Sequence, residues 1–119
     1  MTANPDFSAF THAKLVEHDD SVSIIYSPGG PADAHLSPVF AAHSLEGSGY
    51  DWQSAIHASL LDSPVLERFG FDSEGGMFCA YGTDRAALHE VATLLEALLA
   101  DPERLAAALA VAVEHDLLD

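Results

Sequence analysis

The chain has 119 residues, 49% of them hydrophobic, which suits one folded domain over residues 1–119 and leaves no room for a second core. Its 19 Asp and Glu residues against 4 Lys and Arg residues give a formal net charge of −15 at pH 7. Such a charge repels phosphate backbones and anionic lipids, so it argues against nucleic-acid and membrane partners. The negative charge would attract a basic protein partner. It is equally consistent with a protein whose acidic residues only keep it soluble.

Cys79 is the only cysteine, so the sequence excludes an intramolecular disulfide and is typical of a reducing compartment. Residues 1–10 show no basic segment followed by an apolar run. No stretch approaches the roughly 20 apolar residues that span a bilayer. These features predict a cytoplasmic protein without a membrane anchor.

The N-terminal third of the sequence predicts a hairpin and a loop. Lys14–Val16 and Val22–Tyr26 are short runs rich in β-branched residues, and the polar residues His18–Ser21 between them favour a turn. Ser27–Ser37 contains two prolines and two adjacent glycines, which predict a loop without a regular element.

The middle of the chain predicts two helices. Pro38 is placed to begin a short helix through Leu45, with a strand as the alternative. Asp51 is predicted to be the N-cap of the next helix, which should end near Leu61. Apolar residues at fourfold spacing give that helix one buried face: Trp52, Ile56 and Leu60.

The second half predicts another hairpin and two long helices. Phe69–Phe71 and Met77–Tyr81 flank a turn at Glu74–Gly76. A helix should begin at Thr83 or Asp84, with an inward stripe at helical spacing formed by Leu88, Val91, Leu95 and Leu98. Asp101 and Pro102 are a helix-start signal, and the last helix should run to about His115 with its own stripe of Leu105, Leu109 and Ala112.

The order of elements predicts an α+β domain. Its antiparallel sheet should have four or more strands in two hairpins, because the connections are too short for parallel crossovers. Three to four helices, the last two at the C-terminus, should cover one face of this sheet.

The sequence indicates no catalytic, metal or cofactor site. None of its 7 histidines pairs with another at the i, i+4 spacing of a zinc motif, and Cys79 has no Cys-x-x-Cys partner. Ser48 lies between two glycines, as in a nucleophile elbow, but it lacks the parallel strand-to-helix context of that motif. Tyr50 and Asp51 follow where a phosphate loop would have a lysine. A small hydrolase that uses Ser48 or Cys79 is the less favoured alternative.

Two strings stand out: Glu46–Trp52, EGSGYDW, and Phe71–Tyr81, FDSEGGMFCAY. They resemble the immunity protein 51 family of bacterial polymorphic toxin systems, whose pattern is a glutamate, Gly-Asn-Gly-Tyr-Asp-Trp and, further on, Phe-Asp-x-Glu-x-x-Met-Phe. Ser48 replaces the asparagine of that pattern. The resemblance covers the chain from about Lys14 to Leu109, and its specificity lies in these two strings.

The resemblance implies a binding protein that neutralises a cognate toxin domain. The acidity suits a basic toxin if it is used in binding, and it fits equally well if it serves only solubility. An adaptor or regulatory domain without a toxin partner is the alternative. Within the two strings, acidic residues and one aromatic are predicted to contact the toxin: Glu46, Tyr50, Asp72 and Glu74. The other shared residues are predicted to be structural: Gly47, Gly49, Asp51, Trp52, Phe71, Met77 and Phe78.

Overall fold

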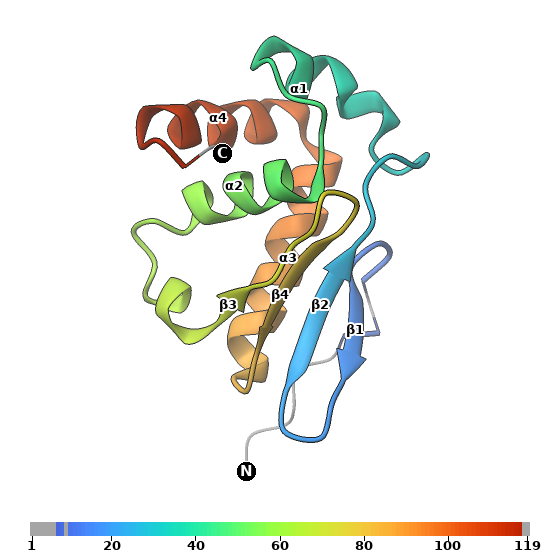
Figure 1. Cartoon of the computed structure of the whole chain (residues 1–119), viewed down its shortest axis with the longest axis vertical. Helices are drawn as coiled ribbons and strands as arrows, with labels where there is room; N and C mark the ends of the chain where they lie inside the picture. The colour runs from blue at the N-terminus through green and yellow to red at the C-terminus, as the bar shows by residue number, and fades with distance from the viewer. Residues whose placement is uncertain (1–6, 9, 118–119) are drawn as a thin grey trace.

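A computed structural model describes residues 7–8 and 10–117. Over these residues the chain forms one four-stranded antiparallel sheet and four α-helices, which confirms the predicted α+β class (Figure 1). The strands are β1 (Lys14–Glu17), β2 (Val22–Tyr26), β3 (Gly70–Phe71) and β4 (Phe78–Gly82), in the sheet order β1-β2-β4-β3.

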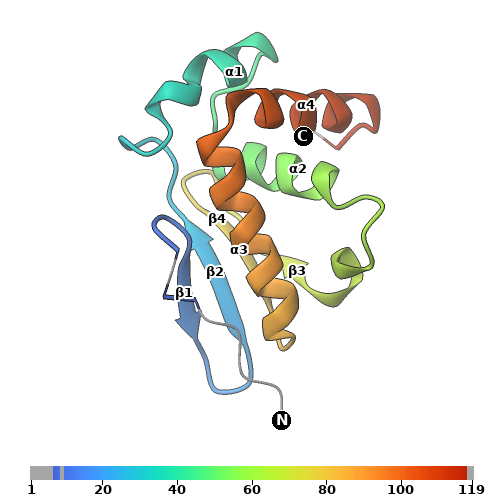
Figure 2. The ribbon, with the colours of Figure 1, turned by 180° about the vertical axis from the view of Figure 1, so that it is seen from behind.

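The two predicted hairpins join through β2 and β4, where Ile24 lies opposite Ala80. Because side chains alternate across a strand, one face of the sheet carries the buried residues Val22, Ile24, Tyr26, Phe78 and Ala80. The helix α3 (Arg85–Ala100) packs against β2 and β4 on this face, as the view in Figure 2 shows.

The two C-terminal helices form where their start signals predict. The Asp84 carboxylate accepts a hydrogen bond from the Ala87 amide and caps α3. Asp101 ends α3 and caps α4 (Pro102–Glu114), accepting from the amides of Glu103 and Arg104. The predicted inward stripes are buried, namely Leu88, Val91, Leu95 and Leu98 on α3 and Leu105, Leu109 and Ala112 on α4.

Three helices gather at one end of the sheet instead of over its face (Figure 1). α1 (Ser37–Ala42) and α2 (Gly49–Ser59) both pack against α4, and α2 also contacts β4. The predicted inward face of α2 is buried, with Trp52 and Ile56 fully enclosed and Leu60 at the helix end. The sheet therefore has one face covered by α3, and a helical layer stands beyond the β3–β4 turn.

Two local predictions need correction. The predicted loop contains a turn of 3-10 helix, η1 (Ala34–Leu36), which leads directly into α1 at Ser37. α1 ends at Ala42 and not at Leu45, because Ser44 adopts a φ of 62° that breaks the helix.

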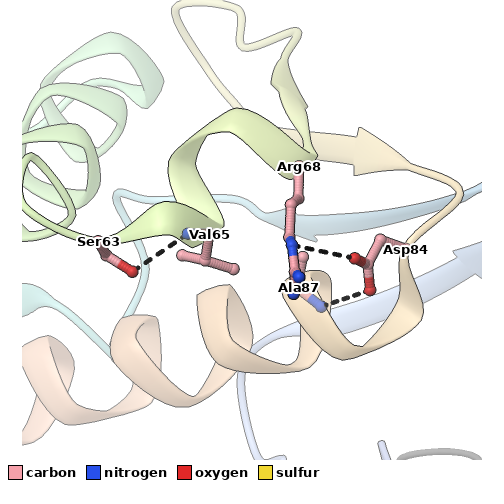
Figure 3. Close-up of polar contacts among 5 residues, drawn as sticks. All are labelled: Ser63, Val65, Arg68, Asp84 and Ala87. Carbon is pink, nitrogen blue, oxygen red and sulfur yellow. Dashed lines mark hydrogen bonds and ion pairs between the residues drawn. The ribbon is translucent and has the colours of Figure 1, made fainter.

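A second 3-10 helix, η2 (Pro64–Arg68), was not predicted and is held at both ends (Figure 3). At its start the Ser63 hydroxyl accepts a hydrogen bond from the Val65 amide at 3.2 Å. At its end Arg68 lies 3.8 Å from the Asp84 carboxylate that caps α3. The first contact caps η2, and the second links its end to the beginning of α3.

Candidate functional site

The two distinctive strings meet in the structure. The Gly49 amide at the start of α2 donates a hydrogen bond to the Gly75 carbonyl in the β3–β4 turn, at 2.8 Å. Glu74 and Met77 close that turn by two backbone hydrogen bonds. We call the residues Glu46–Asp51 and Glu74–Met77 the junction. It is a backbone-to-backbone contact between segments that are separate in sequence.

Gly49 allows the close approach at the junction. A Cβ atom at this position would overlap the carbonyl oxygens of Glu74 and Met77, which are main-chain atoms of the turn. Gly47 has a φ of +83°, a conformation that side chains disfavour, and a Cβ there would lie 3.1 Å from the Phe40 ring. Both glycines are buried, and each meets a different neighbour.

Asp51 was predicted to be the N-cap of α2, and this is wrong. The N-cap is Ser48, whose backbone is extended and whose hydroxyl accepts a hydrogen bond from the Asp51 amide at 3.2 Å. The Asp51 carboxylate reaches back and accepts from the amides of Gly47 and Ser48, each at 2.9 Å. This reciprocal capping box ties the loop to the helix, so Asp51 has a structural contact in place of a free carboxylate.

The aromatic and apolar members of the strings line the interior behind the junction. Trp52 is fully buried, with the Tyr26 and Phe40 rings in edge contact at 5.5 and 5.4 Å between centroids. Phe78 is also fully buried, and Phe71 and Met77 are half-buried at the edge of the core.

The four residues predicted to contact a toxin are all exposed. Glu46 precedes the capping box, Tyr50 lies on the first turn of α2 with 44% of its surface exposed, and Glu74 belongs to the turn that Gly49 contacts. The structure thus brings these three residues to the junction. Asp72 lies two residues before Glu74, on the face of the sheet that points away from α3.

That second sheet face also carries a residue that sequence reasoning missed. Tyr81 on β4 is 45% exposed and its ring lies over Gly70 of the neighbouring strand, where an added Cβ would come 2.9 Å from the ring. The available signal was the strand alternation, since Phe78 and Ala80 point inward and therefore Cys79 and Tyr81 point outward.

The side chains with possible covalent chemistry are not activated. Burial raises the pKa of the Cys79 thiol, and the nearby Asp72 carboxylate raises it further, so the neutral thiol persists at pH 7. The Ser48 hydroxyl is occupied as a helix cap. In the part of the chain that the structure describes, no three metal-ligating side chains are grouped closely enough to hold an ion.

A comparison with family models matches residues 13–113 to immunity protein 51. The chain belongs to the immunity protein 51 family. The matched region contains the junction, the whole sheet and nearly all of α4, so the site described above lies inside the shared domain. No curated protein and no solved structure matches this immunity protein. None of its described helices combines the length and apolar character that crossing a bilayer requires.

Proposed function

We propose that this immunity protein binds a cognate toxin domain and neutralises it by contact, using the exposed junction residues Glu46, Tyr50 and Glu74 together with Asp72. The observation that carries the proposal is the hydrogen bond from Gly49 to Gly75, which joins the two distinctive strings into one surface. Occlusion of this kind needs complementarity and no catalytic residue. The protein would act in the cytoplasm, where its single cysteine stays reduced.

The distribution of charge supports a basic partner. Two of the 4 basic residues are already in ion pairs, Arg85 with Glu17 at 2.8 Å and Arg68 with Asp84 at 3.8 Å. The junction contributes the exposed carboxylates of Glu46 and Glu74, while Asp51 is engaged in the capping box. An approaching basic surface would therefore meet the Glu46 and Glu74 carboxylates, which form no ion pair among the described residues, and the exposed Tyr50 ring of the same junction.

Removing the two junction charges should weaken toxin binding. In the double variant Glu46→Gln with Glu74→Gln, we expect about a tenfold loss of affinity, mainly through slower association, because exposed interface charges steer encounter. The measurement is surface plasmon resonance against the product of the adjacent gene, which is the candidate toxin. The matched control is Glu67→Gln with Glu90→Gln, which removes the same charge from η2 and from α3, and its affinity should stay within about twofold.

Equal losses in the two double variants would show that net charge alone matters and would remove the junction from the proposal. Failure of the unaltered protein to bind the toxin domain or to protect cells that express it would overturn the proposed function.

The association rate constant of the unaltered pair should fall as salt rises. Raising the ionic strength from about 0.01 M to about 0.15 M shortens the Debye length from roughly 30 Å to 8 Å, which screens the attraction between an acidic and a basic surface. We expect a decrease of about tenfold, measured by stopped-flow fluorescence of a label on the toxin. A rate constant that is independent of salt would contradict a basic partner while leaving toxin binding intact.

A further inference from the structure

The sheet face opposite α3 is open to solvent within the described chain. In Figure 1 no helix crosses in front of β1, β2 and β4 on this side, whereas Figure 2 shows α3 across the other side. Two large apolar side chains lie exposed on the open face, Val16 at 36% and Tyr81 at 45%. Asp72 connects this face to the junction, because it follows β3 and leads into the turn that carries Glu74.

A shallow, wide-open hollow lies in the open face where the two hairpins meet at β2 and β4. Its lining comes from β2, β4, the end of β3 and the β1–β2 turn: His18, Ser21, Ser23, Asp72, Cys79 and Tyr81. The floor is formed by Ser23 and Cys79, which are 8% and 6% exposed, and the rim by the exposed side chains of Asp72 and Tyr81. At the far end the His18 Nε2 lies 3.1 Å from the Ser23 hydroxyl.

The groups in this hollow suit a positively charged side chain. Asp72 supplies a carboxylate that only accepts hydrogen bonds, and the serine hydroxyls accept as well as donate. Tyr81 supplies an aromatic ring for a cation to contact. Among the described residues, no lysine or arginine lines the hollow. Asp19 and Asp20 are exposed in the adjacent β1–β2 turn and add negative charge to that of the Asp72 carboxylate.

We propose that this hollow receives one arginine or lysine side chain of the toxin, held between the Asp72 carboxylate and the Tyr81 ring. This inference rests on the proposed toxin binding and adds to it a specific contact outside the junction. An arginine is the better fit of the two, because its planar guanidinium has five donors and no acceptor and stacks on aromatic rings.

The ring of Tyr81 is placed for this contact by its own strand neighbour. Gly70 on β3 leaves space under the ring, so the ring lies across the sheet beside the hollow instead of extending freely into solvent. An aromatic side chain with little freedom to lose makes an efficient anchor, since binding it costs less conformational entropy.

The test measures the affinity of the adjacent gene's product, the candidate toxin, for four variants of the full chain. Asp72→Asn and Tyr81→Leu should each lower affinity about tenfold or more, because the first removes the charge and the second removes the ring. Tyr81→Phe keeps the ring and should remain within about threefold, as should the control Glu90→Gln on α3. Urea midpoints measured alongside should match that of the unaltered protein for Asp72→Asn and Glu90→Gln, whose side chains are exposed. The midpoint of Tyr81→Leu should fall slightly, because the Tyr81 ring packs over Gly70, and Tyr81→Phe keeps that packing.

A double-mutant cycle identifies the toxin side chain. Each lysine and arginine of the toxin is replaced by glutamine and measured against both the unaltered protein and Asp72→Asn. One toxin position should show coupling, so that its replacement weakens binding to the unaltered protein about tenfold but hardly affects binding to Asp72→Asn. If no basic position couples, or if Asp72→Asn and Tyr81→Leu bind as tightly as the unaltered protein, the hollow is not a contact site.

These outcomes separate the two proposals. Normal binding by the Asp72 and Tyr81 variants, with loss of affinity in the Glu46 and Glu74 double variant, overturns the hollow and leaves the junction. Absence of binding by the unaltered protein overturns the proposed function and the hollow with it.

Discussion

Replacing Gly49 with alanine should lower the free energy of unfolding by about 3 kcal/mol, the upper end of the usual cost of overpacking. The added methyl group would overlap the carbonyl oxygens of Glu74 and Met77. These are backbone atoms of a hydrogen-bonded turn, so no side-chain rotation can relieve the overlap. The turn must move away from α2 and the hydrogen bond from Gly49 to Gly75 must lengthen. Urea denaturation followed by far-UV circular dichroism measures the loss.

Gly75→Ala is the matched control for this effect. It adds the same methyl group to the other partner of the same hydrogen bond, at a position where no atom lies within 4 Å of the new Cβ. Its backbone does not require a glycine conformation, so the stability change should remain within about 1 kcal/mol of zero. Similar losses in the two variants would mean that replacing any glycine of the junction by alanine lowers stability. The overlap of the new methyl group with the turn would then not be the cause.

The elements with strong local signals were predictable from the sequence. The Asp101–Pro102 pair marked the break between the last two helices, and the stripes at helical spacing identified their buried faces. Both hairpins followed from short β-branched or aromatic runs around polar turns. These predictions succeeded because each depends on residues within a few positions of one another.

The capping of α2 shows the limit of a local signal. Ser48 and Asp51 are both residue types that cap helices, and they stand three positions apart, the spacing of a capping box. With Asp51 as the N-cap, the predicted helix would begin at Trp52, whereas α2 begins at Gly49. The first turn of α2 begins at Gly49 because the Ser48 backbone is extended and its hydroxyl is aimed at the Asp51 amide.

The arrangement of the candidate site was beyond local reasoning. Nothing near Gly49 in the sequence indicates that its amide binds the Gly75 carbonyl, because this contact depends on how β4 and α2 pack. Tyr81 was missed because Met77–Tyr81 is continuously apolar, a pattern that predicts burial on both faces. In the structure no helix covers the outer face of β4. The Tyr81 ring on that face is therefore exposed, although it would be buried if helices covered both faces of the sheet.

Replacing Trp52 with alanine should lower the free energy of unfolding by about 4 kcal/mol, within the range for a large aromatic removed from a core. Trp52 is 0% exposed and connects three elements, since its ring contacts Tyr26 at the end of β2 and Phe40 of α1 while its own backbone belongs to α2. The cavity left by alanine would border all three, so helix α2 and the junction at its start would lose their common support. The midpoint of urea denaturation should fall accordingly.

Trp52→Phe separates ring packing from the indole N–H. The Nε1 atom is buried without a hydrogen-bond partner among the described residues, so phenylalanine removes an unpaired donor while it keeps an aromatic ring against Tyr26 and Phe40. Its cost should be nearer 1 kcal/mol, because the smaller cavity is partly offset by the loss of an unsatisfied polar group. A phenylalanine variant as unstable as the alanine variant would contradict this expectation, because it would show that an aromatic ring of smaller size does not restore the packing of Trp52.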